Sequence, residues 1–175
     1  MFRIAVIGSQ CTGKSSVAEA LAEKLKLPRI SEVARKFDKS MFVNKTNKEF
    51  CNLQHQILSM QLKEEAKYKE FVSDRSTIDN MAYWVHNCAN IATTEENSLY
   101  VSKALGNVKN YTHLFLLVPE FYPVDDGFRD TNIVYQLQIA EAIHTILHMN
   151  SIKHHTLRGT LENRLKDALN ILKVT

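Results

Sequence analysis

The sequence predicts an α/β fold in which helices cover both faces of a mostly parallel central sheet, giving three layers. β-rich segments alternate with amphipathic segments along the whole chain, which is typical of parallel strands joined by helices. The first segment, residues 2–7, is apolar at the consecutive positions 4–7, as expected of a strand buried on both faces. It ends at Gly8, and a helix is expected from Lys14 onward.

The other elements follow from the spacing of apolar residues and from the positions of Gly and Pro. The first helix is expected to end near Pro28. Further strands are expected over residues 29–31, 71–73, 113–118 and 154–157, and further helices over residues 48–70, 78–85, 132–148 and 160–173. Ligands of parallel sheets bind beyond the carboxyl ends of the strands, so residues that follow strands are the first site candidates.

The composition is that of one globular domain spanning residues 1–175. The chain is 45% hydrophobic and 23% charged with a net charge of +3, which excludes disorder as its main state. No apolar run approaches the ~20 residues of a membrane span, so no membrane partner is expected. The cysteines (Cys11, Cys51 and Cys88) are odd in number and far apart, which favours reduced thiols and a cytoplasmic location. The sequence gives no indication of the oligomeric state.

A phosphate-binding motif lies between the first strand and the first helix. Residues 8–15 read Gly-Ser-Gln-Cys-Thr-Gly-Lys-Ser and fit G-x-x-x-x-G-K-[ST] without a gap. The two glycines permit torsions that turn backbone N–H groups toward a phosphate. Lys14 supplies charge at the β- and γ-phosphates, and the Ser15 hydroxyl can ligate Mg²⁺. The expected nucleotide contacts come from Gly8, Gln10, Cys11, Thr12, Gly13, Lys14, Ser15 and Ser16.

The loop alone does not define the reaction, because P-loop proteins include switches, motors and small-molecule kinases. A GTPase would carry an Asn-Lys-x-Asp guanine reader after a late strand, but the two Asn-Lys pairs here lie early and lack the Asp. A motor ATPase usually has a hydrophobic strand that ends in Asp-Glu. The equivalent strand here continues into Asp74-Arg75-Ser76.

This triplet resembles the thymidylate kinase and deoxynucleoside kinase group of P-loop kinases and the related nicotinamide riboside kinases. In that group a D/E-R-[SYH] triplet follows the third strand. Glu32 stands where the nucleoside kinases place an acid after the second strand, and residues 126–130 resemble their arginine-bearing lid. Leu157-Arg158-Gly159 with Arg164 resembles the loop that holds adenine. The resemblance implies a lid at about residues 120–131 and a nucleotide contact at Gly159.

Each candidate has a chemical role and an alternative. Asp74 is expected to hold Mg²⁺, directly or through water, although it could instead cap the next helix. Arg75 is expected to contact the acceptor and the γ-phosphate together, with a surface ion pair as the alternative. Arg129 is expected to act from the lid on the charge of the transition state, with a plain salt bridge to nearby Asp residues as the alternative.

The acceptor depends largely on Glu32. A hydroxyl acceptor needs a general base, and Glu32 is the candidate, unless it only pairs with Arg35 or Lys36. A monophosphate acceptor needs no base, and Arg35 and Arg75 would then be its clamps. Gln54 could read an acceptor base by paired hydrogen bonds, or it could lie on an exposed polar face.

Two positions depart from thymidylate kinases, which usually have an acidic residue at the position of Gln10 and Tyr or His at that of Ser76. We therefore expect an ATP- and Mg²⁺-dependent kinase acting on a hydroxyl of a nucleoside, a nucleotide or a hydroxymethylated base in DNA. The last acceptor is that of a phage-type subfamily of DNA kinases, which would place the protein in the host cytoplasm. The alternatives are a deoxynucleoside monophosphate kinase and a regulatory ATPase without an acceptor.

Overall fold

The computed structural model describes residues 1–42, 46–120 and 132–174. In these residues five strands form one sheet with the order β2-β3-β1-β4-β5, and every pairing is parallel. The strands are β1 (Arg3–Ile7), β2 (Arg29–Ile30), β3 (Phe71–Asp74), β4 (His113–Leu117) and β5 (His155–Leu157). The predicted α/β class with a parallel sheet is confirmed.

Helices connect these strands in the order expected of parallel crossovers. The α-helices are α1 (Lys14–Leu25), α2 (Asn47–Ala66), α3 (Thr77–Asn87), α4 (Thr94–Val108), α5 (Ile133–Met149) and α6 (Leu161–Leu172), and the 3₁₀-helices are η1 (Val33–Lys36) and η2 (Lys39–Phe42). None of the helices in the described ranges combines the length and the apolar composition that crossing a membrane requires.

Two of these helices differ from the sequence-based expectation. Helix α2 ends at Ala66 rather than at residue 70, because the residues after it attach to the start of β1. There Arg3 Nη1 donates to the Tyr68 carbonyl oxygen at 2.9 Å, and the Phe2 N–H donates to Glu70 Oε1 at 2.6 Å. Helix α4 was not predicted. It fully buries only Tyr100 and Ala104, but Val101, Leu105 and Val108 also pack against the core, so apolar residues at helical spacing were present in the sequence and were overlooked.

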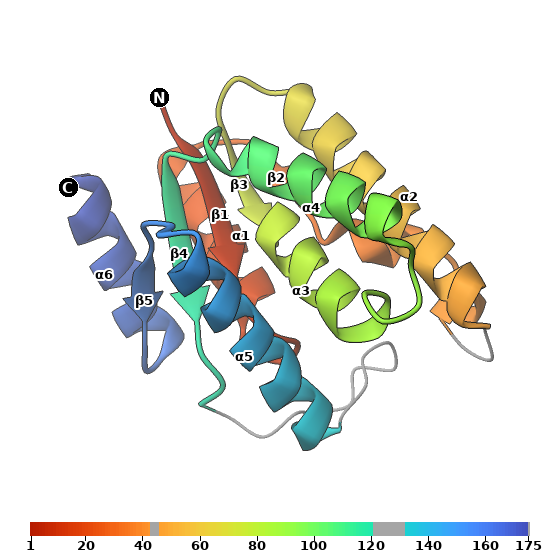
Figure 1. Ribbon diagram of the computed structural model, residues 1–175. Helices are drawn as coiled ribbons and strands as arrows, with labels where there is room; N and C mark the ends of the chain where they lie inside the picture. The colour runs from red at the N-terminus through yellow and green to blue at the C-terminus, as the bar shows by residue number, and fades with distance from the viewer. Residues whose placement is uncertain (43–45, 121–131, 175) are drawn as a thin grey trace.

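The sheet is covered on both faces, and alternate residues of β1 point to opposite layers. Ile4 and Val6 pack with residues of α1 and α6, including Val17 and Ala168. Ala5 and Ile7 belong to the core formed with α2, α3, α4 and α5. Figure 1 shows α3 and α5 side by side in front of the sheet. The first strand is thus buried on both faces, as its sequence predicts.

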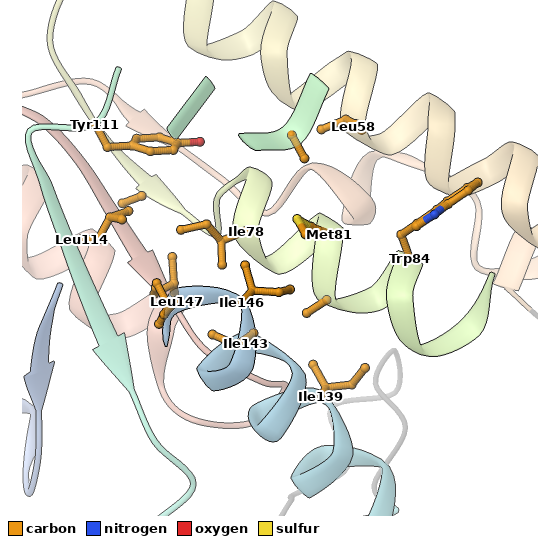
Figure 2. Packing of buried hydrophobic residues seen from close by; sticks show 14 of the residues in the cluster. Leu58, Ile78, Met81, Trp84, Tyr111, Leu114, Ile139, Ile143, Ile146 and Leu147 are labelled. Atoms are coloured by element: carbon orange, nitrogen blue, oxygen red, sulfur yellow. The ribbon is translucent and has the colours of Figure 1, made fainter. Parts of the chain in front are cut away.

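The larger core fixes α3 and α5 against each other. The α5 side chains Ile139, Ile143 and Ile146 point toward Ile78 and Met81 of α3 (Figure 2). All five side chains are at most 7% exposed. Burying an aliphatic side chain of this size contributes roughly 1.5–3 kcal/mol to folding. This packing matters for the site because residues of both helices hold the loop that follows β1.

A buried carboxyl group ties α2 and α4 to the start of α3. Glu65 is 1% exposed, and its oxygens accept hydrogen bonds from Gln61 Nε2 (2.7 Å), Asn107 Nδ2 (2.7 Å) and the Tyr111 hydroxyl (2.6 Å). The Tyr111 oxygen in turn accepts a hydrogen bond from the Thr77 N–H at 3.2 Å, at the first residue of α3. Burial raises the pKa of Glu65 above its ordinary value, against the effect of the three donors.

This raised pKa predicts how the stability depends on pH. Between its ordinary value of 4.5 and the raised native value, folded Glu65 retains a proton that the unfolded chain has released, so its contribution to stability is lost as pH rises. Glu65→Gln does not titrate. Its free energy of unfolding, relative to that of the wild type, should therefore increase in urea titrations as the pH rises from the ordinary pKa of 4.5 toward the raised native pKa.

The neighbouring Glu64 provides a control of opposite sign. Hydrogen bonds from Lys67 and Lys36 lower the pKa of Glu64, so its contribution is present above the ordinary value and is lost at lower pH. The relative stability of Glu64→Gln should therefore fall as pH rises. Parallel pH profiles for the two variants would contradict the account of Glu65.

Candidate active site

The loop of residues 8–15 joins β1 to α1 and takes the backbone form that its glycines predict. Gly8 has φ 147° and Gly13 has φ 86°, torsions that residues with a side chain rarely adopt. A Cβ atom on Gly8 would lie 2.3 Å from the carbonyl oxygen of Leu117, the last residue of β4. The first glycine is therefore required both by its torsion and by the close approach of the neighbouring strand.

Three helices hold the loop in place from outside. The Gly8 N–H donates to Asp79 Oδ1 of α3 at 3.0 Å. The Gln10 carbonyl oxygen accepts from Gln136 Nε2 of α5 at 2.8 Å, and the Thr12 carbonyl oxygen accepts from Arg164 Nη1 of α6 at 2.7 Å. These contacts orient the backbone of the loop before any ligand arrives.

Lys14 lies under the loop with its ammonium group buried. The residue is 1% exposed, and its Nζ donates to the Ser9 carbonyl oxygen and lies 3.4 Å from Thr12 Oγ1. Burial, together with the charge of Arg75, lowers the pKa of Lys14 to about 7. An anion bound in the loop would favour the charged form and reverse this effect.

Asp74, Ser15 and Ser16 are the residues from which metal and phosphate contacts were expected. Asp74 ends β3 and is 1% exposed, and its Oδ1 has no hydrogen-bond partner among the described residues. Its other oxygen lies 3.9 Å from Arg29 Nη2. The alternative role for Asp74 as a helix cap is wrong, because Ser76 caps α3 through a hydrogen bond from the Ile78 N–H.

A hydroxyl group and an unpartnered buried carboxylate oxygen are hard oxygen donors of the kind that Mg²⁺ prefers. Ser15 is partly buried in the first turn of α1, and Ser16 beside it is exposed. In the described ranges no group of three His, Cys, Asp or Glu side chains forms a separate metal site. The residues present at the loop would therefore fit a magnesium ion.

Arg75 is held in a strained and buried conformation directly after β3. Its φ is 84°, in the left-handed region, and the residue is 6% exposed. Its Nε donates to Glu32 Oε1 at 2.6 Å, and its Nη1 is buried without a hydrogen-bond partner in the described residues. Backbone strain of this kind clusters at functional sites. The alternative of a surface ion pair is wrong for Arg75.

Glu32 is shared between two guanidinium groups. Its side chain is 4% exposed, Oε1 accepts from Arg75, and Oε2 accepts from Arg35 Nε at 3.0 Å. The predicted pairing of Glu32 with Arg35 occurs, but Glu32 also pairs with Arg75. The structure thus brings Glu32, Arg35 and Arg75 together at the ends of β2 and β3.

Gln54 lies on α2 and is 4% exposed, so the alternative of an exposed polar face is wrong. Its carbonyl oxygen and that of Asn80 lie 3.4 and 3.3 Å from the Tyr100 hydroxyl, which joins α2, α3 and α4. The position of Gln54 is therefore the interior side of α2. Its role as a reader of the acceptor stays a prediction.

The segment around Gly159 contacts the loop through Arg164. Gly159 has φ 81°, and its N–H donates to Glu120 Oε2 at 2.9 Å. The same oxygen accepts from Arg164 Nη2 at 2.6 Å, while Arg164 Nη1 reaches Thr12. Glu120 is the first residue of the expected lid, and residues 121–131, including Arg129, lie outside the described residues.

Three residues that contact the loop or Arg75 were missed by sequence reasoning: Asp79, Tyr83 and Gln136. Asp79 and Ser76 form a capping box, a pattern visible in the sequence as Ser-x-x-Asp at the start of a helix. The Tyr83 hydroxyl donates to Gln10 Oε1 at 3.2 Å, and its ring lies 5.2 Å from the Arg75 guanidinium carbon. Neither Tyr83 nor Gln136 belongs to a local motif that could reveal such contacts.

A parallel sheet of this order, with the Gly8–Ser15 loop after its central strand, defines a P-loop NTPase fold. A family model described as an AAA domain matches residues 3–164, so the chain belongs to this AAA domain family. No match was found among curated proteins.

Solved structures share the fold over almost the whole chain. The deoxyadenosine kinase of M. mycoides is 13% identical with a TM-score of 0.73, covering 97% of this chain and 98% of that one. A NadR protein in complex with NR is 18% identical with a TM-score of 0.75, covering 97% of this chain and 50% of that one. The shikimate kinase of Aquifex aeolicus is 18% identical with a TM-score of 0.60, covering 98% and 96%.

The close approach at Gly8 predicts a large effect of a single methyl group. Gly8→Ala should lower the free energy of unfolding by at least about 2 kcal/mol, since its torsion and its contact with the Leu117 backbone are both unfavourable. Gly106→Ala is the matched control, because Gly106 lies in α4 with open space around it, and it should stabilise by roughly 0.5–1 kcal/mol. Equal stability of the two variants in urea unfolding would refute this account of the loop.

Proposed function

We propose that the protein is an ATP- and Mg²⁺-dependent kinase that transfers the γ-phosphoryl group to a hydroxyl of a nucleoside, a nucleotide or a hydroxymethylated base in DNA. The observation that carries this proposal is the buried Glu32–Arg75 pair at the ends of β2 and β3, beside the phosphate loop. A site that only binds and hydrolyses a nucleotide needs the loop and the metal ligands. It does not need a buried acid and guanidinium on the side where an acceptor would enter.

The similar structures support the proposal through their kinds of reaction. Two of them are kinases named for deoxyadenosine and for shikimate, and the deoxyadenosine kinase was solved with dCMP and dCDP. A third similar fold is a NadR protein bound to NR. These proteins differ in the small molecule that they bind. For this chain the acceptor class therefore rests on its own residues.

In the proposed reaction the loop and Lys14 bind the β- and γ-phosphates, and Ser15 and Asp74 hold Mg²⁺, which supplies neutralising charge to the phosphate oxygens. Arg75 Nη1, which pairs with Asp79 but makes no hydrogen bond among the described residues, would donate to the transferring group or to the acceptor. Phosphoryl transfer depends mainly on positioning and on cations around three equatorial oxygens, and this set of groups provides both. In this proposal Arg129 acts from the lid on the charge of the transition state. Gly159 belongs to the loop that holds the adenine of the nucleotide.

Glu32 is proposed as the general base for a hydroxyl acceptor. Its two guanidinium partners fix the plane of the carboxylate, so that an acceptor hydroxyl would meet an oriented oxygen. The competing proposal is a monophosphate acceptor. It is favoured by one observation, namely that the guanidinium groups of Arg35 and Arg75 both pair with Glu32 and would be close enough to bind one phosphate together.

One assay separates a kinase from a regulatory ATPase. We expect ADP release from Mg-ATP to depend on the acceptor when nucleosides, deoxynucleoside monophosphates and DNA with hydroxymethylated bases are supplied in turn. Acceptor-independent release as the sole activity would refute the kinase proposal and favour the regulatory ATPase.

Substitution of Glu32 then tests the acceptor class. Glu32→Gln keeps the shape of the side chain but removes its basicity, and a positioned base is worth roughly 10²–10⁴-fold. With a hydroxyl acceptor the kcat of Glu32→Gln should fall at least ~100-fold, while ATP binding changes little. Arg35→Ala is the matched control, because it removes the other partner of Glu32 and leaves the base in place.

The competing proposal predicts different results for Glu32→Gln and Arg35→Ala. If the acceptor is a monophosphate, Glu32→Gln should retain most of its kcat. Arg35→Ala should instead raise the KM for the acceptor. That pattern would overturn the hydroxyl acceptor and leave the kinase standing.

A further inference from the structure

Asp79 is a buried carboxylate beside the loop to which the proposed reaction gives no role. It is 0% exposed in the first turn of α3. Its Oδ1 accepts a hydrogen bond from the Gly8 N–H at 3.0 Å, across 71 residues of sequence. Its Oδ2 accepts from the Ser76 N–H at 2.8 Å and from Ser76 Oγ at 3.1 Å. One side chain thus joins the first residue of the loop to the cap of α3.

The same carboxylate faces Arg75. Asp79 Oδ1 lies 3.7 Å from Arg75 Nη1, and this is its only ion pair within 4.0 Å among the described residues. Arg75 Nε donates to Glu32 Oε1 at 2.6 Å, and the Tyr83 ring lies 5.2 Å from the guanidinium carbon. The Arg75 guanidinium is therefore held by Glu32, which follows β2, and by residues of α3. The same Asp79 Oδ1 that faces Arg75 also accepts the hydrogen bond from the Gly8 N–H of the loop.

A cap alone does not account for this arrangement. The capping box of α4 uses Thr93 and Glu96 in the same way, and that pair is exposed. Asp79 instead is fully buried, and burying a carboxylate is costly unless its contacts repay the cost. The additional contacts are those to Gly8 and Arg75, the two parts that must meet at one phosphoryl group.

We propose that Asp79 is a positioning residue for phosphoryl transfer, which holds Gly8 of the loop and the Arg75 guanidinium in a fixed relation. It acts through these two groups and does not touch the substrate. This inference rests on the kinase function proposed above. Loss of the carboxylate should misplace Arg75 relative to the loop and should therefore slow the reaction more than it weakens ATP binding.

The test compares Asp79→Asn with Glu96→Gln. Asp79→Asn keeps the size of the side chain and one oxygen acceptor but removes the charge that faces Arg75. Its kcat should fall at least about tenfold with a change in the KM for ATP below about threefold. Glu96→Gln weakens the equivalent cap of α4 and should leave both parameters unchanged. Asp79→Ser is a second neutral variant with a hydroxyl acceptor, and thermal unfolding identifies which variants are folded.

A double-variant cycle shows whether Asp79 acts through Arg75. In an Arg75→Lys background, Asp79→Asn should lower kcat by less than about threefold, because the guanidinium that it positions is already gone. The role of Asp79 would be overturned if the kcat of the double variant fell by the full product of the two single effects. It would also be overturned if a folded Asp79→Asn or Asp79→Ser enzyme had wild-type kcat. Absence of acceptor-dependent ADP release by the wild-type protein would overturn the proposed function instead.

Discussion

The Lys14 ammonium group is buried at the end of β1, and much of the surrounding structure makes this burial possible. Removing an ammonium group from water costs several kcal/mol unless nearby groups compensate for it. Compensation comes from the Ser9 carbonyl oxygen and from the acidic groups of Asp79, Asp74 and Glu32, which favour the charged form. Those acids belong to α3, β3 and the segment after β2. The buried charge of Lys14 is therefore stabilised by carboxylates from three separate parts of the chain, which meet at one edge of the sheet.

The order of the strands brings these acidic residues close to the loop. β1 lies between β3 and β4, so the loop after β1 is flanked by Asp74 and Arg75 on one side and by Leu117 on the other. The loop backbone is then fixed by hydrogen bonds from α5 and α6 and to α3. Packing of α3 against α5 supports two of these contacts at once. Stability of the core and geometry of the site are consequently coupled.

Most of the fold and the centre of the site could be predicted from the sequence, because each depends on local patterns. Residues 8–15 form a contiguous motif, and Asp74 and Arg75 follow a strand that its composition reveals. What sequence reasoning missed depends on long-range contacts. Gln136 reaches Gln10 across 126 residues, and nothing in the residues around Gln136 indicates such a contact. Helix α4 was missed although its apolar residues Tyr100, Ala104 and Val108 recur at helical spacing, so the local pattern was available and was overlooked.

Binding of Mg-ATP measured by titration calorimetry tests the central claim most directly, namely that the loop and buried Lys14 form a triphosphate site. The wild-type protein should bind one equivalent of Mg-ATP. Lys14→Ala should remain folded, since the substitution removes a costly buried charge, but its affinity for Mg-ATP should fall at least about tenfold because the charge at the β- and γ-phosphates is lost. A folded wild-type protein that binds no Mg-ATP, or a Lys14→Ala variant that binds it as tightly as the wild type, would contradict the account.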